Sequence, residues 1–233
     1  MHNQNNPKNS TGRSGTTSNG GSTMPLVSGS NSFESAKLPK GFKSRGLVKT
    51  RTSIKSPDGH MVSPIAGNRF ACIDDPEAVD ARRMRLNPQA AENLVGIVVR
   101  PQSGVPTIAA DGASLICEGV ELKKGKRLVF AFNFMTWGDM PWNDFATFEA
   151  LPTNPGSYGL QRHVLCDLAD LATAGRRASD WRLVTWTLAD DFTGTLTWTV
   201  ANGQEITDWT LLDPAAEAFS NPPALLIDDI RVF

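Results

Sequence analysis

The most obvious candidates for chemistry in this chain are acidic side chains that lie near predicted turns and in the C-terminal segment. Calcium prefers oxygen ligands from carboxylates, amides and backbone carbonyls. Four acids could supply them, although without EF-hand spacing, and are candidate calcium ligands: Asp139, Asp144, Asp228 and Asp229. The alternative is that these acids cap backbone N–H groups in turns.

Two tryptophans flank the same acidic loop. Trp137 and Trp142 lie five residues apart, and Asn143 follows the second of them. Exposed indole rings at such a loop would stack on sugar rings or anchor a protein partner. We therefore take Trp137, Trp142 and Asn143 as candidate ligand-binding residues. The alternative is that the two rings close the end of the hydrophobic core.

Motifs that support catalysis are missing. The sequence has no Gly-x-Ser-x-Gly elbow, no His-Glu-x-x-His pair, no phosphate loop and no dinucleotide fingerprint. His163 and Cys166 stand three residues apart, so they would face opposite sides of a strand but could pair in a helix. Paired acids could hydrolyse sugars, but the sequence does not show which acids face each other. We expect a protein that is not an enzyme.

Charge divides the chain unevenly. Residues 1–60 contain nine Lys and Arg and two acids, while residues 61–233 contain 14 and 22. We predict a flexible, basic N-terminal arm over 1–60 that becomes ordered on a partner; a solvated tail is the alternative. Its expected contact residues are Phe33, Lys37, Lys40, Phe42, Lys43, Arg45, Lys49 and Arg51. No aromatic residue follows Phe42 in the arm, so nucleic acid is not the expected partner.

From residue 61 onward, the pattern predicts one all-β domain. In residues 128–135, large apolar side chains alternate with smaller ones, which is typical of a strand. Similar runs follow at 144–151, 181–188, 194–201 and 224–233. A short helix is expected at 74–85, and 163–174 fits a strand or a short helix. We predict a jelly-roll-like β-sandwich over residues 61–233.

The cysteine pattern and the hydropathy of the sequence indicate in which cellular compartment the protein is made. Cys72, Cys117 and Cys166 are far apart and odd in number, so we expect buried free thiols. No apolar run fits a secretory signal or a membrane span. We expect synthesis in the cytoplasm and no membrane insertion.

Two segments resemble parts of known β-sandwich modules. Residues 132–145 (FNFMTWGDMPWNDF) resemble a strand–loop–strand of bacterial adhesins and carbohydrate-binding proteins. Residues 224–233 (ALLIDDIRVF) are similar to the last strand of jelly-roll carbohydrate-binding modules. The resemblance covers about residues 90–233. It implies sugar binding or adhesion, often with a structural calcium.

The arm and the missing catalytic motifs together favour an assembly role. We predict a non-catalytic structural protein, a decoration or accessory component of a phage-like particle. Its arm would strap onto neighbouring protein subunits, and the protein would be associated with the virion. The alternative function is a carbohydrate-binding or adhesin-type module with glycans as partners.

Overall fold

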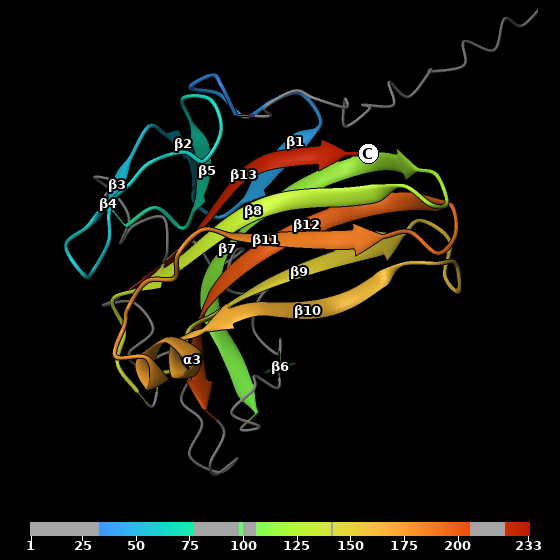
Figure 1. Ribbon diagram of the computed structural model, residues 1–233. Helices are drawn as coiled ribbons and strands as arrows, with labels where there is room; N and C mark the ends of the chain where they lie inside the picture. Colours follow the sequence, from blue (N-terminus) through green and yellow to red (C-terminus); the bar gives the residue numbers. More distant parts are fainter. Residues whose placement is uncertain (1–32, 77–97, 100–105, 141, 206–221) are drawn as a thin grey trace, which may run out of the picture.

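Two antiparallel sheets pack face to face and form a β-sandwich (Figure 1). This computed structural model describes residues 33–76, 98–99, 106–140, 142–205 and 222–233. The sandwich confirms the predicted fold class.

The first sheet contains the longest strands. Its order is β1 (Phe42–Arg45), β7 (Thr107–Leu122), β12 (Phe192–Glu205), β9 (Phe145–Pro152) and β10 (Leu160–Asp167), and β6 (Val98–Val99) also pairs with β7. The second sheet has the order β11 (Arg182–Thr187), β8 (Arg127–Thr136), β13 (Pro223–Val232), β5 (Phe70–Ile73) and β2 (Val48–Arg51). A separate hairpin joins β3 (Ile54–Lys55) to β4 (Met61–Val62).

The alternation of side chains in residues 128–135 correctly predicts which of them face the core. In β8, Leu128, Phe130, Phe132 and Phe134 all face the main core between the sheets. The ring centroid of Phe130 lies 5.4 Å from that of Trp198 on β12, in an edge-to-face contact. The other four strand predictions are confirmed by β9, β11, β12 and β13.

Three further expectations concern local structure. The ambiguous segment 163–174 is both strand and helix, because β10 ends at Asp167 and α3 (Leu168–Thr173) begins there. Asp167 is the N-cap, and its side chain accepts a hydrogen bond from the backbone N–H of Asp170 at 2.8 Å. Most of the helix expected at 74–85 lies outside the described residues. No helix in the described part of the chain is long and apolar enough to cross a membrane.

Residues 33–60 belong to the sandwich, so the predicted domain boundary at residue 60 is wrong. Strand β1 pairs with β7 in one sheet, and β2 pairs with β5 in the other (Figure 1). Phe33 is 0% exposed, and its ring lies 5.5 Å from that of Phe42, which stacks on Trp198 at 6.4 Å. The apolar residues assigned to a partner therefore pack into the chain's own core. Residues 1–32 lie outside the described residues.

The basic residues of this segment have different roles. Arg51 forms an ion pair with the buried carboxylate of Asp75 at 2.6 Å, and Lys43 pairs with Glu118 at 2.5 Å. The remaining predicted contact residues are exposed on the surface: Lys37, Lys40, Arg45 and Lys49.

All three cysteines are buried free thiols, as predicted. Burial raises the pKa of Cys117 to about 12 and that of Cys166 to about 11. At neutral pH both side chains are therefore protonated.

Candidate ligand pocket beneath the 54–62 hairpin

A second hydrophobic cluster lies on the outer face of the β8-containing sheet. It is built from Ile54, Phe70, Cys72, Met135, Ala178, Ala224 and Leu226, with Trp137, Trp181 and Val62 packed against it. The cluster forms because β8, β13 and β5 present apolar side chains outward as well as inward. The 54–62 hairpin covers this face and inserts Ile54 into the cluster.

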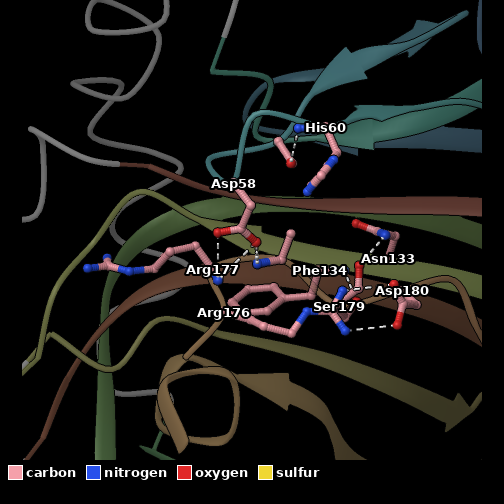
Figure 2. Close-up of polar contacts among 10 residues, drawn as sticks. Asp58, His60, Asn133, Phe134, Arg176, Arg177, Ser179 and Asp180 are labelled. Atoms are coloured by element: carbon pink, nitrogen blue, oxygen red, sulfur yellow. Dashed lines mark hydrogen bonds and ion pairs between the residues drawn. The ribbon is translucent and has the colours of Figure 1, made fainter. Parts of the chain in front are cut away.

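Asp58 fastens the turn of the hairpin to a segment that follows α3. Its carboxylate accepts backbone hydrogen bonds from Arg177 at 3.2 Å and from Ala178 at 3.1 Å (Figure 2). Beyond the hairpin, the indole N–H of Trp181 donates to the carbonyl oxygen of Ser63 at 2.9 Å. These two contacts hold the hairpin across the sheet.

A pocket of about 250 Å³ lies between the hairpin, β8 and the segment after α3. This volume is about eight times that of a water molecule in the liquid. The lining residues come from three parts of the chain that are far apart in sequence. They are Ser56, Asp58, His60, Met61, Val62, Ser63, Asn133, Arg176, Ala178, Ser179, Asp180 and Trp181.

Asn133, one of the lining residues, carries a buried hydrogen-bond acceptor that has no partner. Asn133 is 2% exposed, and its side-chain Nδ2 donates a hydrogen bond to the carbonyl oxygen of Ser179 at 2.6 Å (Figure 2). Its Oδ1 has no hydrogen-bond partner. A buried acceptor without a donor costs about 1–3 kcal/mol. A water molecule or a ligand donor in the pocket would remove that cost.

Both arginines at the pocket are committed to other groups. The Arg176 guanidinium makes two hydrogen bonds of 2.8 Å to the Asp180 carboxylate. This bonding lowers the pKa of Asp180 and raises that of Arg176. The Arg177 guanidinium contacts the carbonyl oxygen of Gly138 and the Asp139 carboxylate.

The three loop residues predicted to bind a ligand lie away from the pocket lining. Trp137 packs against the second cluster and Trp142 is half-buried. Asn143 is fully buried; its Oδ1 accepts from the N–H of Ala169 at 2.9 Å, and its Nδ2 donates to Thr107 Oγ1 at 3.3 Å. Asn143 thus positions α3 against the sheet. None of the three residues lines the pocket.

The four acids predicted to bind calcium lie in separate environments. Asp139 is exposed and pairs with Arg177, while the buried Asp144 accepts from Thr136 Oγ1 and from the N–H of Gly203. Asp229 pairs with Arg231 at 2.5 Å. Among the described residues, no group of three or more His, Cys, Asp or Glu side chains is placed to hold a metal ion. Calcium binding stays a prediction.

The Asp228 carboxylate accepts hydrogen bonds from backbone N–H groups of the loop after β4 and so holds that loop in place. Its Oδ2 accepts from the N–H groups of Ile65 at 2.9 Å and Ala66 at 3.1 Å, and its Oδ1 accepts from that of Asp229 at 2.8 Å. Burial raises the pKa of Asp228 despite these three donors, which act to lower it. The carboxylate therefore carries a desolvation cost when it is charged.

This cost predicts a pH dependence of stability. A folded-state pKa above the unfolded value stabilises the fold at acid pH, and that contribution is lost as pH rises from the unfolded pKa through the folded one. We expect the unfolding free energy of wild type, relative to Asp228→Asn, to fall as pH rises through this window. Urea unfolding of both proteins between pH 3 and 7 measures the difference. A constant difference would contradict the prediction.

The Cys166 thiol has no histidine beside it. Cys166 is 1% exposed and His163 is exposed. The predicted alternation is broken here, because a register shift between Val164 and Cys166 puts both His163 and Cys166 opposite core residues of β9, Phe148 and Ala146. One charged group near Cys166 Sγ is the guanidinium of Arg182, at 3.9 Å. A nucleophilic cysteine needs a thiolate and a nearby base, and this thiol has a pKa of about 11.

The pocket residues were not predicted from the sequence, although Asn133 carried a signal. It lies at an outward position of β8 between Ala131 and Met135, where an apolar side chain would fit the cluster. A polar residue at such a position is a mark of a specific hydrogen-bonding need. Trp181, at the start of the strand-like run 181–188, packs half-buried on the outer face beside the pocket.

No protein-family model matches the sequence, and no curated protein matches it. Solved structures similar to this chain are β-sandwich modules. One is the K1 adhesin domain of Lys-gingipain from Porphyromonas gingivalis W83, with 16% identity, 88% of this chain and 98% of that chain covered, and a TM-score of 0.38. Another is the cellulose-binding domain of a Cellulomonas fimi β-1,4-glucanase, with 13% identity, 90% and 96% covered, and a TM-score of 0.37.

A third is the xylan-binding domain of a Paenibacillus barcinonensis protein, with 12% identity, 89% and 92% covered, and a TM-score of 0.33. These structures belong to the class that the sequence resemblance named, carbohydrate-binding modules and adhesins. The sandwich assignment itself follows from the two sheets of this chain.

Proposed function

We propose that this protein is a non-catalytic binding module that recognises a carbohydrate in the pocket beneath the 54–62 hairpin. The observation that carries the proposal is the buried, unpaired Oδ1 of Asn133. A binding site typically combines an apolar wall with a few polar groups that fix the ligand's orientation. Here Met61, Val62 and Trp181 supply apolar atoms beside that acceptor.

Carbohydrate fits this combination because each sugar ring offers hydroxyl donors and an apolar C–H face. A hydroxyl at the base of the pocket would donate to Asn133 Oδ1 and remove the cost of the unpaired acceptor. The ring would contact Met61 and Trp181. Sugar binding is also what the resemblance of residues 132–145 and 224–233 implies.

The assembly role depended on residues 1–60 acting as a strap, and the structure describes residues 33–60 of them. Phe33 and Phe42 pack in the chain's own core, and β1 and β2 complete its two sheets. These residues are thus used within the fold. For this reason we favour the carbohydrate-binding alternative over a component of a phage-like particle.

Exposed residues at the pocket mouth provide the test. We expect His60→Ala and Met61→Ala each to weaken binding about tenfold or more, equivalent to about 1.4 kcal/mol, because both side chains line the pocket. The probes are oligosaccharides of glucose, xylose and galactose, with affinity measured by calorimetry and by tryptophan fluorescence. Wild type should bind at least one of them.

The matched controls are an exposed histidine and an exposed methionine elsewhere. His163→Ala on β10 and Met140→Ala in the loop after β8 should leave binding unchanged. Loss of binding in the control variants alone would place the site elsewhere. No binding by wild type would refute the proposal.

A further inference from the structure

We infer that the pocket selects an uncharged sugar unit and rejects the corresponding uronate, whose carboxylate replaces a hydroxymethyl group. This inference rests on the proposed carbohydrate binding and adds the chemical class of the unit that enters the pocket. It follows from which hydrogen-bonding groups of the lining are free and which are already engaged.

The unpaired side-chain group of the lining residue Asn133 is an acceptor. Asn133 Oδ1 has no partner, while the Nδ2 of the same amide is engaged by Ser179. A sugar hydroxyl can donate to Oδ1, whereas an ionised carboxylate has no proton to donate. Asn133 therefore favours a hydroxyl over a carboxylate at this position.

The arginine side chains at the pocket and two backbone N–H groups beside it are already paired. Both terminal nitrogens of Arg176 bond to Asp180 at 2.8 Å. Arg177, which lies beside the lining, bonds to Asp139 and Gly138, and the N–H groups of Arg177 and Ala178 bond to Asp58 (Figure 2). A uronate carboxylate would have to compete with Asp180 for the two terminal nitrogens of Arg176.

The net charge of the lining residues also disfavours an anionic sugar. Asp58 and Asp180 against Arg176 give a net charge of −1 when His60 is neutral. An anion entering the pocket would lose hydration without a compensating partner, which is costly. A neutral sugar has no such cost.

The test compares matched pairs of methyl glycosides, glucoside with glucuronide and galactoside with galacturonide. Binding is followed by NMR chemical-shift changes at pH 8, where imidazole side chains are ordinarily neutral. We expect the neutral member of a pair to bind at least about tenfold more tightly to wild type. Equal binding of both members would overturn the inference and leave carbohydrate binding intact.

Asp180→Asn tests the origin of the selectivity. Asp180 is exposed, so the variant keeps the fold, and loss of its charge releases the Arg176 guanidinium. A guanidinium binds carboxylates with two parallel hydrogen bonds. We expect the uronate to gain affinity until the preference for the neutral sugar falls to about threefold or less.

Asp190→Asn is the matched control. Asp190 is an exposed acid that pairs with Lys124 at 3.3 Å and does not line the pocket. It should keep the wild-type preference. An unchanged preference in Asp180→Asn would overturn the role assigned to the Arg176–Asp180 pair. Binding of neither sugar to wild type would instead refute the proposed function, and this inference with it.

Discussion

Replacing Phe33 by alanine is expected to lower the unfolding free energy by about 3–5 kcal/mol, the usual range for a buried phenylalanine. Phe33 is 0% exposed and belongs to the main core, where its ring contacts Phe42. A flexible arm would not make such a contact, and truncating one of its side chains would leave the domain's stability unchanged. Guanidinium unfolding of the wild type and the variant measures the difference.

Phe233→Ala is the control for this experiment. Phe233 is 51% exposed at the end of β13, where the Arg127 guanidinium lies 5.9 Å from its ring centroid. Loss of this surface ring should cost less than about 1 kcal/mol. If Phe33→Ala and Phe233→Ala have the same small effect, residues 33–60 do not form part of the core.

The alternating pattern of residues 128–135 was sufficient to predict a strand and its inner face. The pattern did not identify the partners of that strand. Strand β8 pairs with β11, about 50 residues later, and with β13, about 90 residues later. Such pairings depend on the shape of the whole core rather than on local sequence.

The prediction of a flexible arm failed over residues 33–60 for a similar reason. Phe33 and Phe42 are isolated aromatic residues in a polar, basic segment, and such a composition is typical of disorder. Both rings are nonetheless part of the main core or packed against it. The ladders of β1 and β2 complete the two sheets, and sequence composition alone does not reveal these tertiary contacts.

The pocket could not be predicted because it combines three distant segments. The hairpin, β8 and residues 176–181 meet only after the second sheet has formed. The loop around Trp137 and Trp142 had the more obvious composition for a site. Its buried polar residues have structural contacts instead: Asn143 joins α3 to Thr107 of β7, and Asp144 joins Gly203 of β12 to Thr136 of β8.

Gly112→Ala is expected to reduce stability by more than about 4 kcal/mol, a loss large enough to prevent folding at 37 °C. Gly112 lies in β7 opposite Ala201 of β12, with a φ of +155°. A Cβ at this position would overlap the carbonyl oxygen of Val200 and lie 2.8 Å from Ala201 Cα. Both are backbone atoms of the neighbouring strand, so β12 would have to move away from β7.

Gly119→Ala separates this overlap from backbone strain. Gly119 lies in the same strand with a φ of +66°, but a Cβ there would meet nothing within 4 Å. Its cost should be about 1–2 kcal/mol, the usual penalty for a left-handed non-glycine residue. Equal losses in the two variants, measured by thermal and urea unfolding, would mean that the β7–β12 backbones are farther apart at Gly112. A much larger loss in Gly112→Ala would show that close approach of these two strands fixes the first sheet, since β12 also pairs with β9.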